Sequence, residues 1–226
     1  MKFECSTEHL LNAVSTAARF VERRANLPVL GGILITAENN RVVLRATNLE
    51  CGVEITIAGK VGQEGVVAVP GSVIYGFLSN ARGKNVSVAL VGELLKVETE
   101  RASASIKTIP HDDFPILPRV SAERSFSVKA SDLTRAIRSV AYCASTSAIK
   151  PELQSVLVFG EAGKLVTVAT DSFRLAEKSV PLRAGGSVPQ LLVPARNAAE
   201  LMRIWQISTR VNNDAAIIER IVVVAE

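Results

Sequence analysis

The sequence predicts an α+β protein built as a tandem repeat, in which each copy packs two helices on antiparallel β-sheet. Three observations lead to this fold class. A gap-free shift aligns residues 3–47 with residues 126–170 and gives eleven identities in 45 positions. Each copy holds two segments whose apolar residues fall at helical spacing. The segments between them alternate apolar and polar residues and end in turn residues, which is typical of strands joined by hairpins.

The repeat has the length of a whole domain. The alignment moves the chain by 123 residues, from position 3 to position 126, whereas solenoid repeats are only ~20–50 residues long. A later match, shifted by one more residue, pairs 67–78 with 191–202. The sequence therefore predicts two domains, at 1–120 and 121–226. The first is complete, whereas the second is expected to lack its final strand and exit linker, because nothing in it corresponds to 103–118.

In the first copy, the element order follows from the periodicity. Residues 2–6 form a short strand, and Ser6 is suited to cap the helix that follows. That helix carries apolar residues at helical spacing, namely Leu10, Leu11, Val14, Ala17, Ala18 and Val21. After Pro28, the pattern predicts strands at 32–36, 41–47, 53–57 and 66–69. A second helix opens at Gly71, with Val73, Ile74, Phe77 and Leu78 expected to face inward. Strands at 86–90, 94–100 and 103–109 complete the copy.

The second copy repeats this order. The pattern predicts a strand at 125–129, a helix at 131–144, strands near 153–159, 164–170, 174–180 and 190–193, and a helix at 195–206 that is followed by further strands. Each copy therefore consists of a strand, a helix and strands, and then the same series again.

The charge balance is mildly basic. The chain has 26 Lys and Arg residues against 22 Asp and Glu residues, for a net charge of +4. Its densest basic patch is only Arg23-Arg24. This balance permits a nucleic-acid partner, but it favours sparse contacts to phosphates over base reading.

Cysteine usage and the N-terminus indicate a cytoplasmic protein. The three cysteines are far apart and form no CxxC pair, which argues against a disulfide framework or a zinc site. The first residues lack the apolar core of a signal peptide, and no apolar run approaches the ~18 residues of a membrane span. We predict no metal and no cofactor.

One segment has the composition of a catalytic site. His111, Asp112 and Asp113 are adjacent, and a histidine with two carboxylates can bind a metal or transfer protons. However, adjacent side chains in an extended segment point to opposite sides, and Pro110 and Pro115 flank them. A linker or hinge is the favoured interpretation, and a metal-dependent hydrolase is the alternative.

Several segments together resemble the bacterial DNA polymerase III beta subunit family, the sliding clamps. VATDSFRLAEKSVP at 168–181 is similar to the family's TDG-x-RLA segment. Four further segments resemble the family at matching positions: MKFECSTEHLLNAV at the N-terminus, NLPVLGGILI at 26–35, IPHDDFPILP at 109–118 and VPARNAAELMR at 193–203. The resemblance covers the first domain and most of the second, whereas family members carry three. It implies tandem DNA-clamp domains and a non-catalytic subunit of the polymerase III holoenzyme.

The resemblance implies a ring around duplex DNA, formed by a head-to-tail homodimer. Such a ring attracts phosphates at any sequence, through Lys and Arg. The four predicted helices carry nine basic residues that are the candidates for these contacts: Arg19, Arg23, Arg24, Arg82, Lys84, Arg135, Arg138, Arg196 and Arg203. Arg24 matches a DNA-contacting position of the family. The alternative for the group is an ordinary solvated helix face.

The resemblance also implies a cleft that takes short peptides from the polymerase III catalytic subunit, the clamp loader and repair proteins. The matching residues here are Leu153, Thr170, Ser172, Phe173, Arg174 and Leu175. Ser172 and Phe173 replace the glycine and histidine of some members. Taken alone, the two leucines would be core residues, and Thr170-Asp171 would begin a turn.

Three functions follow from the sequence. The preferred one is a processivity factor that encircles DNA, tethers the replicative polymerase and recruits partners through the peptide cleft. The alternatives are a metal-dependent hydrolase at 111–113 and a repeat scaffold that binds only protein.

Overall fold

The computed structural model describes residues 1–22, 27–117, 126–147, 149–182, 184–185, 188, 190–210 and 217–223. These residues form two compact units. The first unit holds residues 1–117 together with strand β16 (Ile217–Val223), and the second holds the described residues from 126 to 210.

Two five-stranded antiparallel sheets make up the first unit. One has the order β16-β4-β3-β2-β6 and the other has the order β5-β1-β7-β8-β9. The strands are β1 (Lys2–Ser6), β2 (Gly32–Glu38), β3 (Arg41–Thr47), β4 (Cys51–Ala58), β5 (Lys60–Gln63), β6 (Gly65–Pro70), β7 (Asn85–Val91), β8 (Leu94–Thr99) and β9 (Ser103–Lys107). The alternating pattern predicts all of these strands except β5, which it missed because the four residues KVGQ are mostly polar and exposed.

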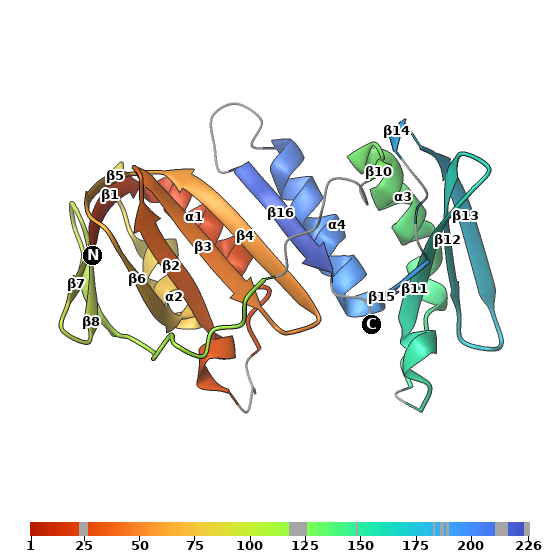
Figure 1. The fold of residues 1–226 in the computed structure, drawn as a ribbon, viewed down its shortest axis with the longest axis horizontal. Helices are drawn as coiled ribbons and strands as arrows, with labels where there is room; N and C mark the ends of the chain where they lie inside the picture. The colour runs from red at the N-terminus through yellow and green to blue at the C-terminus, as the bar shows by residue number, and fades with distance from the viewer. Residues whose placement is uncertain are drawn as a thin grey trace. The chain divides into compact units, whose positions relative to one another are not determined.

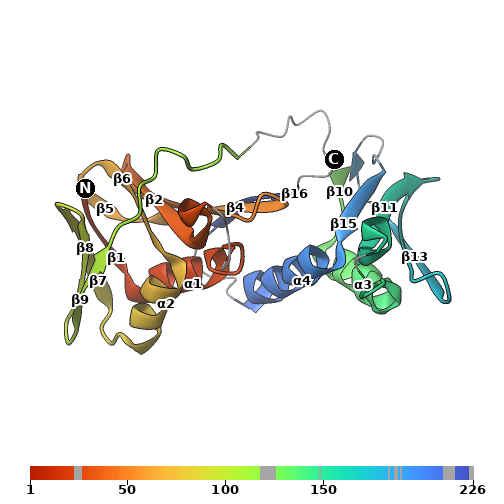
Figure 2. The ribbon, with the colours of Figure 1, turned by 90° about the horizontal axis from the view of Figure 1, so that it is seen from below.

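Two helices, α1 (Thr7–Ala17) and α2 (Gly71–Asn80), lie side by side on one side of this unit, as Figure 2 shows below strands β2 and β4. The Ser6 hydroxyl accepts a hydrogen bond from the His9 backbone N–H at 3.4 Å, so the predicted N-cap is confirmed. Leu10 and Val14 are fully buried on the face of α1 that packs on β3 and β4.

One predicted core position of α2 is wrong. Ile74 and Leu78 are buried, but Val73 is 50% exposed and Phe77 is only half-buried. Residues four apart share a helix face, whereas Val73 lies about 100° away from Ile74 around the helix axis. The inward face of α2 is therefore narrower than its composition indicated.

The second unit repeats the layout of the first. Its main sheet has the order β13-β12-β11-β15, which matches β4-β3-β2-β6 strand for strand. The elements are β10 (Phe126–Ser127), α3 (Ala130–Val140), β11 (Ser155–Glu161), β12 (Lys164–Thr170), β13 (Leu175–Pro181), β14 (Ala184–Gly185), β15 (Leu191–Pro194) and α4 (Ala195–Arg210). Short 3-10 turns, η1 (Pro28–Gly31) and η4 (Pro151–Gln154), precede β2 and β11 at equivalent places.

A buried hydroxyl ties α3 to this sheet. The Thr167 side chain on β12 is fully buried and lies within hydrogen-bond distance of the carbonyl oxygens of Ala136 (3.3 Å) and Lys178 (3.1 Å). Because a buried hydroxyl without a partner is costly, these contacts fix the register between helix and strand. Helix α3 packs on β12 and β13, and α4 packs on β11 and β15 (Figure 1). The predicted α+β class, with helices on antiparallel sheet in both units, is confirmed.

Strand β16 lies in the first unit, although the sequence places 121–226 in the second domain. Its residues pair antiparallel with β4, from Ile217 opposite Thr56 to Val223 opposite Cys51. The repeat alone gave no signal for this pairing, because strand partners far apart in sequence are not encoded in local periodicity.

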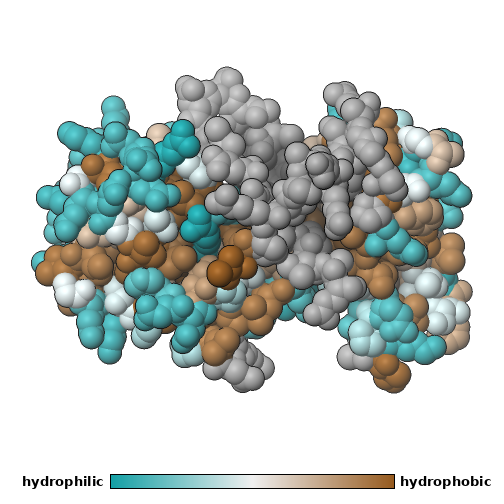
Figure 3. Space-filling model, viewed as in Figure 1, coloured by the Kyte–Doolittle hydropathy of each residue, from teal (hydrophilic) through white to brown (hydrophobic). Residues whose placement is uncertain are grey.

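One face of the described surface mixes polar and apolar residues in both units. On the face drawn in Figure 3, hydrophilic residues are interspersed with smaller hydrophobic areas in both units, as on most protein surfaces. No helix in the described ranges is long and apolar enough to cross a membrane.

Candidate nucleic-acid and peptide-binding sites

The basic candidates of the first unit are exposed. Arg19 follows the end of α1, and its backbone N–H bonds the Thr16 carbonyl at 3.1 Å, so it continues the helical turn. Arg82 and Lys84 are also exposed, but they lie in the loop after α2, which ends at Asn80. Their predicted place in the second helix is thus wrong, because the backbone at Ala81 is extended. The Thr7 backbone N–H bonds the Lys84 carbonyl at 2.9 Å, which holds this loop beside the start of α1.

The basic candidates of the second unit lie on its two helices. Arg135 and Arg138 are exposed on α3, and Arg196 and Arg203 are exposed on α4. Two of the four have acidic neighbours on the same helix face: Arg135 pairs with Asp132 at 2.8 Å and Arg203 pairs with Glu200 at 2.7 Å. Exposed pairs of this kind are weak and exchange readily for a phosphate. Arg23 and Arg24 lie outside the described residues.

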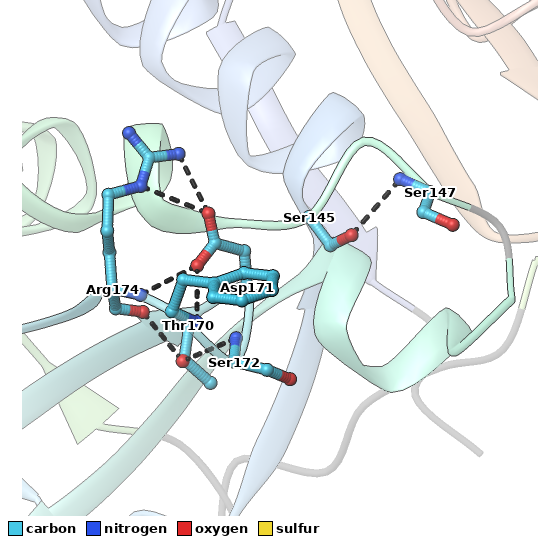
Figure 4. A network of polar contacts seen from close by, with 7 residues as sticks. Ser145, Ser147, Thr170, Asp171, Ser172 and Arg174 are labelled. Carbon is cyan, nitrogen blue, oxygen red and sulfur yellow. Dashed lines mark hydrogen bonds and ion pairs between the residues drawn. The ribbon is translucent and has the colours of Figure 1, made fainter.

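A tight turn joins β12 to β13 and carries most of the predicted peptide-binding residues. The Asp171 carboxylate accepts hydrogen bonds from the backbone N–H groups of Phe173 (2.9 Å) and Arg174 (2.7 Å). Its other oxygen accepts from Nε and Nη2 of Arg174 at 3.0 and 2.9 Å, as Figure 4 shows. These hydrogen bonds lower the pKa of Asp171 from 3.8 to about 2. The two backbone N–H donors have the largest effect, and the Arg174 side chain has the next largest. The carboxylate is therefore charged at neutral pH and fixes the Arg174 guanidinium.

The same turn occurs in the first unit. Thr170 Oγ1 donates to the Arg174 carbonyl at 2.7 Å, as Thr47 Oγ1 donates to the Cys51 carbonyl at 2.9 Å. Asn48 Oδ1 accepts from the Cys51 backbone N–H at 2.7 Å, in the role of Asp171. The turn-forming role that the sequence predicts for Thr170-Asp171 and Thr47-Asn48 is therefore confirmed.

Ser172 occupies a backbone conformation that favours glycine. Its φ is +77°, and the equivalent residue of the first turn, Leu49, has a φ of +73°. Side chains rarely adopt this left-handed region because the Cβ approaches the neighbouring carbonyl. The family's glycine at the matching position fits this geometry, and Ser172 keeps the turn at a cost in strain.

Apolar side chains around this turn face solvent. Phe173 is 96% exposed and Leu175 is 67% exposed, so the interpretation of Leu175 as a core residue is wrong. Leu153, on η4, is half-buried. Its carbonyl accepts a hydrogen bond from the Ser145 backbone N–H at 2.8 Å, which ties η4 to the segment after α3.

Tyr142, in the 3-10 turn Ala141–Cys143 after α3, is an exposed aromatic residue that the sequence analysis did not name. The residue is 64% exposed. The pKa of Tyr142 is raised, first by a side-chain hydrogen bond to Cys143, while the positive charge of Arg174 acts in the opposite direction. In the sequence, the only signal was a tyrosine next to a cysteine at the end of a predicted helix. This pattern does not identify a binding residue.

The segment at 111–113 does not form a site in the structure. All three side chains are exposed, and the Phe114 backbone N–H bonds the His111 carbonyl at 3.0 Å in a simple turn. No group of three His, Cys, Asp or Glu residues in the described ranges could hold a metal ion. The hydrolase alternative therefore has no geometric support among these residues.

The three cysteines are free and buried. Burial, with a smaller effect of the adjacent Glu4, raises the pKa of the Cys5 thiol to about 12. Burial and Glu50 likewise raise that of Cys51 to about 11. Thiols of this kind are weak nucleophiles because the thiolate is disfavoured.

Comparison with known proteins places these features in one family. The profile of the DNA polymerase III beta subunit, N-terminal domain, matches residues 1–118, and that of the central domain matches residues 127–218. The beta sliding clamps of Escherichia coli and Salmonella typhimurium are 30% and 29% identical to the chain over 208 and 206 residues. Each alignment covers 90% of this chain and 56% of the relative, so the chain spans little more than half the length of these relatives.

Solved structures give the same result. Caulobacter crescentus pol III beta superposes with a TM-score of 0.82 and 28% identity, covering 92% of this chain and 58% of that one. The DNA polymerase III subunit beta of Pseudomonas aeruginosa superposes with a TM-score of 0.82 and 26% identity, covering 91% of this chain and 57% of that one. The repeated helix-on-sheet units, the shared turns and these matches together show that the chain belongs to the DNA polymerase III beta subunit family, the bacterial sliding clamps.

Proposed function

We propose that this chain acts as a subunit of a DNA sliding clamp, a non-catalytic processivity factor that holds the replicative polymerase on duplex DNA. The observation that carries the proposal is the match to sliding clamps along nearly the whole chain, in sequence and in fold. The assignment of 1–120 and 121–226 to two successive clamp domains is part of the same proposal. So is a cytoplasmic location.

Contact with DNA is proposed to run through the exposed arginines and lysines. Seven of the nine candidates lie in the described ranges, and all seven side chains are exposed. Long cationic side chains attract phosphates at any sequence and leave the protein free to slide. Contacts to phosphates alone do not fix the protein at one position on the DNA, because sequence is read at the edges of the bases.

The surface around the β12–β13 turn is proposed to bind short peptides of the polymerase and other replication proteins. Phe173, Leu175 and Tyr142 supply exposed apolar area, and Arg174 supplies a fixed cation. Apolar anchors beside an oriented polar group are the usual composition of a peptide-binding surface. The turn gives this surface a preorganised shape, which reduces the entropy lost on binding.

Topology-dependent retention tests the clamp proposal. The chain is incubated with closed circular duplex DNA, in the presence of a clamp loader, and then separated by gel filtration. A clamp stays with the circle and is lost after the DNA is cut once, whereas an ordinary DNA-binding protein stays on both forms. Equal retention on circular and linear DNA would contradict encirclement.

Oligomeric state is a separate part of the proposal. A head-to-tail homodimer has a mass of twice 24.1 kDa. Sedimentation equilibrium measures this mass directly. A chain that remains at 24.1 kDa at all concentrations contradicts self-assembly while leaving DNA and peptide binding testable.

A further inference from the structure

A cavity of about 610 Å³ lies between α1 and α2 in the first unit. Its volume falls within the range of roughly 300–1,000 Å³ that is typical of small-molecule sites. The described residues that line it are Ser15, Ala18, Arg19, Val21, Gly31, Ser72 and Tyr75. None of these is acidic, so the lining favours an anionic ligand over a cation.

Helical spacing brings these residues together. Ser15, Ala18 and Arg19 stand three and four positions apart, and so they share one face of α1 and its last turn. Ser72 and Tyr75 stand three positions apart on α2 and share a face in the same way. Because α1 and α2 pack side by side, the two faces form opposite walls of the cavity.

The base of the cavity is fixed by backbone contacts. The Glu22 backbone N–H bonds the Leu30 carbonyl at 2.8 Å, which ties the segment after α1 to η1 and Gly31. The start of α2 is also close-packed: a Cβ added to Gly71 would lie 3.3 Å from Val21 Cγ1. These contacts fix the positions of the segments that carry Val21 and Gly31 and of the start of α2, which favours a preformed site over one that must order on binding.

The lining combines three kinds of chemistry. Tyr75 is 42% exposed and offers an aromatic ring, on which a nucleobase stacks whatever its sequence. Arg19 is exposed and offers a guanidinium, which pairs with phosphate oxygens. Ser15 and Ser72 offer hydroxyl groups, which both donate and accept hydrogen bonds and suit the edges of any base.

We propose that this cavity binds one unstacked nucleotide of single-stranded DNA, with its base on Tyr75 and its phosphate on Arg19. A base inside a duplex is paired and stacked, and it reaches a protein cavity only after extrusion from the helix. The site therefore selects single strands. It goes beyond the proposed clamp function, in which duplex DNA is contacted through its phosphates alone.

The test compares single-stranded and duplex binding in the same protein. The probes are a fluorescein-labelled oligodeoxythymidylate of about ten nucleotides and a labelled duplex of the same length, titrated by fluorescence anisotropy. Tyr75→Ala is expected to weaken single-strand binding about tenfold, the loss that corresponds to one stacked base. Its effect on duplex binding is expected to be within error.

Two matched variants make the test specific. Tyr75→Phe keeps the ring and is expected to bind the single strand like the wild type. Val73→Ala removes an exposed apolar side chain from the same helix but outside the cavity, and it is expected to change nothing. Circular dichroism of each variant checks the fold. Equal single-strand affinity for Tyr75→Ala and Val73→Ala, or a parallel loss of duplex binding in Tyr75→Ala, overturns the proposal.

A second measurement does not depend on mutation. Thymidine 5′-monophosphate is titrated into the ¹⁵N-labelled chain, and amide shifts are followed by NMR. The expected shifts cluster at the lining residues in α1, η1 and α2. Shifts confined to other parts of the chain refute the cavity as a nucleotide site. They do not affect the clamp proposal, which is tested separately by retention on circular DNA.

Discussion

Replacing Ser172 by glycine is expected to stabilise the second unit. Ser172 has a φ of +77°, and an L-residue in this region costs about 1–2 kcal/mol relative to ordinary backbone. Glycine removes that cost, but it makes the unfolded chain more flexible, which returns about 0.4–1 kcal/mol. The hydrogen bond from the Ser172 backbone N–H to Thr170 Oγ1, at 3.1 Å, survives the change. The midpoints of these two ranges differ by about 0.8 kcal/mol, which is the net gain expected.

Urea denaturation followed by tryptophan fluorescence measures this change in the free energy of unfolding of the second unit. The only tryptophan, Trp205, lies in α4, so its fluorescence reports on the second unit. With a slope of about 2 kcal/mol/M, the midpoint of Ser172→Gly should rise by about 0.3–0.5 M urea. An unchanged or lower midpoint would refute the assignment of strain to this residue.

Two control variants bracket the result. Ser139, an exposed residue inside α3, has helical backbone, and Ser139→Gly should lower the midpoint because glycine weakens helix interiors. Leu49→Gly makes the equivalent change in the first unit, where φ is +73°. It should leave the Trp205 transition in place while raising the stability of the first unit, measured by amide hydrogen exchange in β3 and β4.

Four further predictions concern charge, packing and the linker. The folded pKa of Asp171 is lowered from 3.8 to about 2, so its contribution to stability is present above pH 3.8 and is lost as the pH falls through 2; an NMR-titrated pKa at or above 3.8 contradicts this. Arg138→Gln should reduce the slope of log K against log salt for duplex DNA by about 0.9, whereas Arg101→Gln, an exposed arginine of the β8–β9 turn, is the control. Thr167→Val should destabilise the second unit by about 1–3 kcal/mol, because it removes the buried hydroxyl that lies within hydrogen-bond distance of the Ala136 and Lys178 carbonyl oxygens, and Thr167→Ser should restore most of the loss. Alanine at all three positions 111–113 should leave duplex affinity unchanged, and a large loss would revive a functional role for this segment.

The repeated architecture was predictable because it depends on local patterns. Alternating apolar residues located β2, β3 and β4 and their counterparts, and Ser6 located the start of α1, since capping and periodicity act over a few residues. The two units also share a sheet order, β4-β3-β2-β6 and β13-β12-β11-β15, because the same series of strands occurs once in each copy of the repeat.

The errors have a common origin in contacts that sequence spacing does not encode. Val73 is apolar but lies beyond the edge of the buried face of α2. Arg82 and Lys84 follow α2 because its last residue, Asn80, precedes extended backbone at Ala81. The pairing of β16 with β4 joins residues more than 150 positions apart, which no periodicity reports.

The binding-site residues were only partly predictable. The resemblance identified the turn at Thr170–Leu175, whose exposed side chains the structure then located. Tyr142 was missed because its exposure depends on how the 3-10 turn after α3 orients it. A single aromatic residue in a sequence carries no information about such an orientation.

The paired turns separate what holds a loop together from what a loop displays. In both units, the first two positions supply the threonine hydroxyl and the Asp or Asn oxygen, and the fifth position takes part through its backbone. The fourth position, Phe173 in one turn and Glu50 in the other, donates its backbone N–H to the Asp or Asn oxygen in both turns. The side chain at this position is aromatic in one turn and acidic in the other, while the backbone hydrogen bonds of the turn are the same. Such a five-residue frame is a ready scaffold for engineering, because recognition residues can be exchanged at one position while the hydrogen bonds of the loop stay the same.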